Sequence, residues 1–276
     1  MSAFLPHALV VPEGRHEGRL ALVLHGILGN HKNWRTFGRL LSRQLPGWRF
    51  ALVDLRNHGA SHGAAGPHTL AACADDLEHL AAHLGATVEV VIGHSFGGKV
   101  ALEVARRAGP GLSTVYVLDA SPQKYDVLPG ADHEVMQVLT ALDAVPQPLP
   151  KRGDVVQILA EHGMPETIGR WMTTNLRREG DGFVWTFDLR AAQELLADYF
   201  ATDLWAPLTT SDPTAPQVHL VRAGRSDRWP PDVLAQLDAL PHDARGTVHL
   251  LPNAGHWVHV DDPGGLMDLL VRTFPT

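Results

Sequence analysis

The stretch VEVVIGHSFGGKVAL, residues 88–102, decides the fold because a strand must become a helix inside it. β-Branched residues run up to Gly93, and residues that favour helices resume at Lys99. Gly93 and Gly97 flank Ser95 in the pattern G-x-S-x-G. This pattern is typical of a tight strand-to-helix turn that exposes a nucleophilic serine. The junction therefore predicts a nucleophile at Ser95.

The same junction also fits a second motif, because Gly93, Gly98 and Lys99 spell the G-x-x-x-x-G-K of phosphate-binding loops. Residues 114–119, TVYVLD, look like the apolar strand ending in Asp that holds Mg²⁺ in such proteins. That motif needs Ser or Thr after the lysine, and Val100 stands there. It also normally follows the first strand of its domain, whereas two predicted strands precede this one. A P-loop nucleotide binder is therefore kept only as a remote alternative.

Short apolar runs alternate with helical patterns on both sides of this junction. Six runs are predicted as buried strands of a parallel sheet: 20–26, 48–54, 88–93, 114–119, 217–224 and 247–252. Helices are predicted at 69–84, 98–107, 231–240 and 263–274. Strand–helix alternation of this kind predicts an α/β fold, with a mostly parallel central sheet and helices on both faces.

The alternation stops within residues 123–205, where helical segments surround a possible short hairpin arm in DGFVWTFDL. A block of this length is too long for a loop. We predict that residues 1–122 and 206–276 form the core, and that 123–205 is a helical lid over the carboxyl edge of the sheet. Three lid aromatics are expected to face the site as an apolar wall: Trp171, Trp185 and Phe187.

The composition is that of an ordinary globular protein, with 276 residues, 45% hydrophobic and 19% charged. A formal net charge of −7 argues against a nucleic-acid partner. No apolar run approaches the ~20 residues that cross a bilayer, and the N-terminus lacks the pattern of a secretory signal. Cys73 is the single cysteine, which rules out an intramolecular disulfide. These observations predict a cytoplasmic protein.

Seventeen histidines raise the question of a metal site. The sequence contains neither H-E-x-x-H nor a cysteine cluster. His58 and His62 have a ligand spacing only in a helix, and RNHGASHG is too rich in turn residues to be one. We therefore expect no metal.

Acyl transfer at Ser95 needs a base, an acid that orients the base, and two donors for the oxyanion. His256 follows the last predicted core strand in LLPNAGHWVH, in the Ser-before-His order of such enzymes. The amide of Phe96 opens the helix after the serine and is expected to be one donor. The amide of Ile27, in LHGILGN, is expected to be the second. The sequence therefore predicts Ser95 and His256 as catalytic residues.

The acid has two candidates. Asp227, in VRAGRSDRW, follows a core strand by a short loop, the usual place in this fold. Asp119 ends the strand that follows the helix of the nucleophile. Either carboxylate could reach the imidazole, although Asp is also favoured as a helix cap and in turns.

Five segments together resemble the α/β-hydrolase superfamily, and more narrowly the YbfF-type small bacterial esterases and their mitochondrial relatives: LHGILGNHKNW, DLRNHGASH, GHSFGGK, LDASP and PNAGHWVH. The resemblance implies esterase or thioesterase activity on acyl substrates without a cofactor. It also favours Asp119 as the acid, although this chain has Asp at both places. Asp54 and Arg56 are expected to form a structural ion pair.

These patterns predict a serine hydrolase that cleaves carboxylic esters or thioesters of short- to medium-chain acyl groups through an acyl-enzyme. The expected partner is a small-molecule substrate. A non-hydrolytic receptor or a carbon–carbon bond hydrolase on the same fold are the alternatives. The oligomeric state is not predicted.

Overall fold

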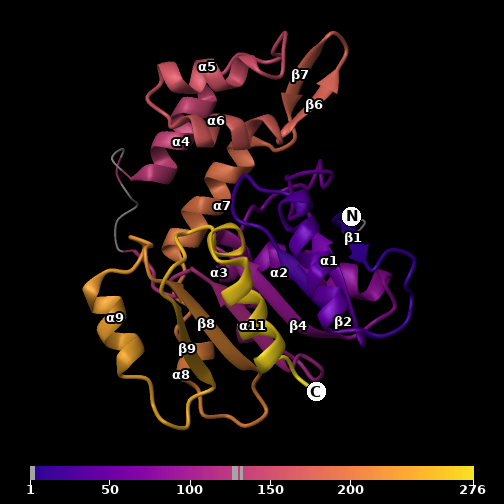
Figure 1. The fold of residues 1–276 in the computed structure, drawn as a ribbon, viewed down its shortest axis with the longest axis vertical. Helices are drawn as coiled ribbons and strands as arrows, with labels where there is room; N and C mark the ends of the chain where they lie inside the picture. Colours follow the sequence, from indigo (N-terminus) through magenta and orange to yellow (C-terminus); the bar gives the residue numbers. More distant parts are fainter. Residues whose placement is uncertain (1–3, 126–129, 131–132) are drawn as a thin grey trace.

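A seven-stranded sheet forms the centre of the computed structural model, which describes residues 4–125, 130 and 133–276 (Figure 1). The strand order is β1-β3-β2-β4-β5-β8-β9, and every pair is parallel except β1 with β3. The strands are β1 (Ala8–Val11), β2 (Arg19–Leu24), β3 (Trp48–Val53), β4 (Val88–His94), β5 (Thr114–Leu118), β8 (Gln217–Ala223) and β9 (Gly246–Leu251). All six predicted strands are present, and β1 is an additional edge strand.

Side chains of each strand alternate between two apolar cores, as the two-residue period of a strand requires. In β2, for example, Leu22 points into one core and Val23 into the other. The first core is covered by α2 (Leu70–His83), α3 (Phe96–Arg106), α8 (Ala206–Thr209) and α9 (Pro231–Asp238). The second is covered by α1 (Arg35–Gln44) and α11 (Pro263–Thr273). The chain therefore has the predicted layers, with helices on both faces of the sheet (Figure 1).

The segment between β5 and β8 carries a helical lid, drawn above the sheet in Figure 1. It contains α4 (Glu134–Asp143), α5 (Asp154–Glu161), α6 (Glu166–Thr173), the hairpin β6 (Leu176–Glu179) with β7 (Gly182–Trp185), and α7 (Leu189–Ala201). These elements share an apolar core of their own. Helix α7 joins the two units, because Leu195 packs in the core of the sheet and Leu196 in the core of the lid.

Two short helices lie in loops at the carboxyl ends of the strands. They are the 3₁₀ helix η1 (His31–Trp34) after β2 and α10 (Val258–Asp261) after β9. Within the described residues, no helix is both long and apolar enough to cross a membrane.

Candidate active site

Ser95 lies on the strained turn between β4 and α3. Its backbone has φ 53° and ψ −118°, a conformation that residues other than glycine rarely adopt. Such strained residues are found at functional sites. A Cβ atom on Gly93 would lie 2.0 Å from the carbonyl oxygen of Gly97. A Cβ on Gly97 would lie 2.6 Å from the carbonyl oxygen of His25. Both glycines of the motif are therefore required by close backbone approach.

His256 lies beside Ser95, although it comes from the loop after β9. Its Nε2 lies 3.1 Å from the hydroxyl oxygen of Ser95. Its Nδ1 lies 2.8 Å from Oδ2 of Asp119, which follows β5. Three segments that are distant in the sequence thus meet at the carboxyl edge of the sheet, with the imidazole between a hydroxyl and a carboxylate.

The carboxylate of Asp119 is buried and held from several sides. Its Oδ1 accepts hydrogen bonds from the backbone N–H of Ala223 at 3.0 Å and from the indole N–H of Trp229 at 2.7 Å. Burial alone would raise the pKa of Asp119, but the contact with His256 and hydrogen bonds from Ser226 and the Ala223 amide lower it overall. Asp119 is therefore ionised near neutral pH and faces the imidazole.

Asp227, the other candidate acid, does not reach His256. Its side chain is 95% exposed and lies 3.9 Å from the guanidinium of Arg228. The loop after β8 directs Trp229 inward and leaves Asp227 in solvent. The expectation that Asp227 could serve as the acid is therefore wrong for this structure, since a carboxylate in water cannot orient a half-buried imidazole.

Two residues beside Ser95, His256 and Asp119 were not predicted from the sequence. The Nε2–H of His94 donates to the carbonyl of His256 at 2.7 Å, because a carbonyl can only accept. Burial lowers the pKa of His94 well below its ordinary value, so the ring is neutral. The second residue is Trp229, which donates to Asp119. The signals are weak, because His94 is the variable residue of G-x-S-x-G and Trp229 looks like any apolar loop residue.

The loop after β2 brings the amide of Ile27 to the same place. Among the described residues, neither the N–H of Ile27 nor that of Phe96 has a protein acceptor. Both residues line the cavity next to Ser95. Two unpaired amides beside the hydroxyl are what an oxyanion site requires.

Two buried neutral histidines fix this loop. Nε2 of His58 accepts the N–H of Leu28 at 3.1 Å, while its Nδ1–H donates to a carbonyl. Nε2 of His25 accepts the N–H of Leu55 at 3.0 Å. Burial lowers the pKa of both rings, to about 3 for His58. These histidines therefore serve as hydrogen-bond acceptors that shape the backbone around Ile27.

A cavity of about 420 Å³ opens above Ser95, between the sheet edge and the lid. Much of its wall is apolar, with Leu28, Val138, Ile168, Trp171 and Tyr199 among the lining residues. A pocket of this size and character suits an apolar ligand group.

Of the three lid aromatics expected at this wall, Trp171 lines the cavity and the other two do not. Phe187 is buried in the core of the lid, and Trp185 stacks on it with ring centroids 5.0 Å apart. Trp185 ends β7 of the hairpin, and Phe187 lies just beyond it. The expected roles of Trp185 and Phe187 in substrate binding are therefore wrong.

The phosphate-binding alternative also fails. Lys99 is buried, and its ammonium group donates to the carbonyls of Gln123 at 2.8 Å and Tyr199 at 2.6 Å. It points toward the base of the lid, away from the turn that would hold a phosphate. Burial lowers the pKa of Lys99 to about 7. This lysine ties α3 to the lid.

The expected pair of Asp54 with Arg56 is not formed either. Arg56 makes a bidentate contact with Asp76 of α2, with distances of 2.7 and 3.0 Å. Asp54 instead faces His7 and His31. The two side chains diverge because the chain leaves β3 after Val53 and enters a turn at Arg56, so the side chains no longer follow the two-residue period of the strand.

The chain matches the alpha/beta hydrolase family over residues 21–269. It is 29% identical to the mouse sn-1-specific diacylglycerol lipase ABHD11 over 254 residues, which cover 89% of this chain and 77% of that protein. It is 24% identical to esterase YbfF of Escherichia coli over 266 residues, 94% of each chain. Among solved structures, a marine microorganism esterase superposes with a TM-score of 0.82 at 21% identity, covering 98% of this chain and 99% of the other. Since the family match spans nearly the whole chain and the fold agrees with it, this protein belongs to the alpha/beta hydrolase family.

Proposed function

We propose that this protein is a serine hydrolase that cleaves carboxylic esters or thioesters of short- to medium-chain acyl groups through an acyl-enzyme. The observation that carries the proposal is the contact of His256 with Ser95 on one side and Asp119 on the other. The named relatives, a diacylglycerol lipase and an esterase, support ester bonds as the target. The apolar cavity supports an acyl chain as the bound group.

In the first half of the reaction, the hydroxyl oxygen of Ser95 attacks the acyl carbonyl carbon while Nε2 of His256 takes the hydroxyl proton. The negative charge moves to the carbonyl oxygen, where the amides of Ile27 and Phe96 donate to it. The carboxylate of Asp119 holds the proton on Nδ1 and stabilises the imidazolium. Collapse of the intermediate breaks the bond to the alcohol or thiol, which leaves with the proton from His256.

In the second half, a water molecule attacks the acyl-enzyme and gives one proton to Nε2 of His256. The second tetrahedral intermediate then breaks its bond to Ser95, which recovers its proton from the imidazolium. The carboxylic acid leaves, and no other reactant is consumed.

The proposal is tested with p-nitrophenyl esters of increasing acyl length, beside acyl-CoA thioesters, on the protein and on its Ser95→Ala variant. We expect turnover by the protein that is greatest below long-chain lengths, and a loss of several orders of magnitude in the variant. A fluorophosphonate probe should label the protein at Ser95. Activity retained by a folded Ser95→Ala protein would overturn the mechanism. Labelling without turnover of any ester would instead favour a specialised substrate.

A further inference from the structure

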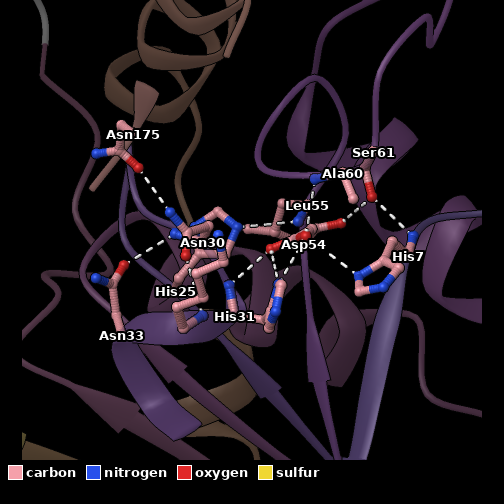
Figure 2. Close-up of polar contacts among 11 residues, drawn as sticks. His7, His25, Asn30, His31, Asn33, Asp54, Leu55, Ala60, Ser61 and Asn175 are labelled. Carbon is pink, nitrogen blue, oxygen red and sulfur yellow. Dashed lines mark hydrogen bonds and ion pairs between the residues drawn. The ribbon is translucent and has the colours of Figure 1, made fainter. Parts of the chain in front are cut away.

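Three side chains outside the proposed active site converge at the carboxyl end of β3. They are His7, which precedes β1, His31, which begins η1, and Asp54, which follows β3 (Figure 2). Nδ1 of His7 lies 3.2 Å from Oδ2 of Asp54, and Nδ1 of His31 lies 2.8 Å from the same oxygen. One ligand atom from each residue falls within 4.8 Å of the others, the one such group of three among the residues described.

The backbone holds these three segments together independently of the imidazoles. The N–H of Asp54 donates to the carbonyl of His7 at 2.9 Å. The N–H of His7 donates to the hydroxyl of Ser61 at 2.7 Å, and that hydroxyl donates to the carbonyl of Asp54 at 2.6 Å. The N–H of His31 donates to Oδ1 of Asp54 at 2.6 Å. The ligand atoms are thus fixed near one another before any ion arrives.

The carboxylate has no strong cationic partner. Its ion-pair contacts are the two imidazoles, and no lysine or arginine pairs with it in the part of the chain that the structure describes. The side chain is fully buried, and its Oδ2 also accepts the N–H of Ala60 at 2.9 Å. A carboxylate is therefore buried beside two imidazoles, without a lysine or arginine to pair with it in the described part of the chain.

Two imidazoles and a carboxylate are ligands that Zn²⁺ takes in proteins. In a tetrahedral site the ligand atoms lie roughly 3.3 Å apart, because each is about 2.0–2.2 Å from the metal. The separations from the two nitrogens to Oδ2, 2.8 and 3.2 Å, are below this value, and all three ligand atoms lie within 4.8 Å of one another, so small side-chain movements would place them around an ion. The side chain of His7 is 43% exposed and that of His31 15%, so an ion can enter from solvent and keep a water as fourth ligand.

We propose that His7, His31 and Asp54 form a Zn²⁺-binding site. On binding, a neutral imidazole takes the tautomer with its proton on Nε2, so that Nδ1 offers a lone pair to the metal, and an imidazolium releases one proton to solvent. The two nitrogens then turn from the carboxylate to the metal. The ion then joins the segment before β1, the start of η1 and the end of β3. The site depends on neither Ser95 nor His256, so it stands or falls apart from the proposed hydrolysis.

The test is a Zn²⁺ titration of untagged, chelator-stripped protein in competition with a chromophoric chelator, together with melting temperature with and without ZnCl₂. The protein, His7→Ala and His16→Ala are compared, since His16 is exposed and lies outside the cluster. We expect one equivalent bound by the protein and by His16→Ala, with a raised melting temperature. His7→Ala should bind at least about tenfold more weakly, because loss of even an outer-shell partner costs that much.

Two further readouts separate this site from other histidines. A His256→Ala variant should keep the Zn²⁺ affinity, which excludes binding at the proposed active site. Circular dichroism should show that His7→Ala is folded, as its exposed side chain predicts. Equal affinity of the protein and His7→Ala, or no stoichiometric binding, would overturn the proposal and leave the cluster as a hydrogen-bonded ion pair.

Discussion

The indole of Trp229 donates to Oδ1 of Asp119 at 2.7 Å, which leaves Oδ2 of the same carboxylate for His256. Trp229 and Asp119 are 110 residues apart in the sequence. The loop after β8 thus contributes a hydrogen-bond donor to the carboxylate. It does not contribute the carboxylate itself, because Asp227 of the same loop is exposed. Orientation of the acid therefore depends on a residue outside the proposed catalytic group.

The two aspartates give opposite predictions. Asp119→Asn should lower kcat for a p-nitrophenyl ester by roughly 10³–10⁴, because an amide favours the wrong imidazole tautomer. Asp227→Asn, a matched change on a side chain in solvent, should alter kcat less than about twofold. Steady-state kinetics of the two purified variants measures both. Equal losses would contradict the assignment of Asp119.

Trp229→Phe removes one donor from a buried carboxylate and keeps most of the ring. The pKa of Asp119 should rise, so the acidic limb of the kcat/KM profile should move to higher pH. A hydrogen bond to a charged group contributes about 1.5–3 kcal/mol, so kcat should fall by roughly tenfold or more. Trp205→Phe is the control, because its ring is partly buried against the core of the sheet and does not line the cavity. A pH profile of Trp229→Phe that superposes on the wild-type profile would refute a positioning role.

Gly97→Ala should destabilise the protein strongly, since the new methyl group would lie 2.6 Å from the carbonyl oxygen of His25. Overpacking against backbone costs about 1–3 kcal/mol or more, which corresponds to roughly 2–12 °C in Tm at this size. A Cβ on Gly109 meets nothing within 4 Å, so Gly109→Ala should leave Tm nearly unchanged. Thermal unfolding followed by circular dichroism compares the two. The packing argument fails if both variants melt alike.

Lys99 gives a stability prediction with a definite sign. Its pKa is lowered from 10.5 to about 7 in the folded protein, so the unfolded chain binds more protons between these values. The lysine therefore destabilises the fold at pH 7, and this effect disappears as pH rises toward 10. The unfolding free energy of wild type minus that of Lys99→Met should increase by a few kcal/mol over this range. Urea unfolding at several pH values measures it, with exposed Lys151→Met as a control that should show a flat difference.

Two aromatic residues of the lid, Trp171 and Trp185, should differ in their effect on the preferred acyl length. Trp171→Ala enlarges the cavity wall and should shift the preferred acyl length, mainly through KM. Trp185→Ala should leave the acyl preference unchanged, because its ring packs on Phe187 outside the cavity. Rates with a series of p-nitrophenyl esters test the pair. An altered preference in Trp185→Ala alone would contradict the cavity described above.

The sheet and its helices were predictable because they rest on local patterns. Continuous apolar runs and helical spacing marked the core strands and their helices, and the spacing of glycines marked the turn at Ser95. The edge strand β1 was missed because Ala8–Val11 is only four residues long and gives a weak signal. Its pairing with β3 is a long-range contact that the local pattern does not contain.

The direction of side chains in loops could not be predicted in the same way. Asp119 and Asp227 both follow strands at one edge, and only the backbone decides which turns inward. Asp119 has a φ of 49° and is held by Ala223 and Trp229, which sequence spacing does not reveal. The same holds for His7, His31 and Asp54, whose proximity depends on three separate segments.

The direct pairing of β5 with β8 has a consequence for how such proteins diversify. Because these neighbouring strands are joined through the lid, the lid can be lengthened, shortened or replaced in evolution without changing the order of the sheet. An exchange that keeps α7 in place would preserve the packing of Leu195 and the anchor from Lys99 to Tyr199. New substrate ranges can then arise from one continuous segment of the gene, while the residues around Ser95 are inherited unchanged.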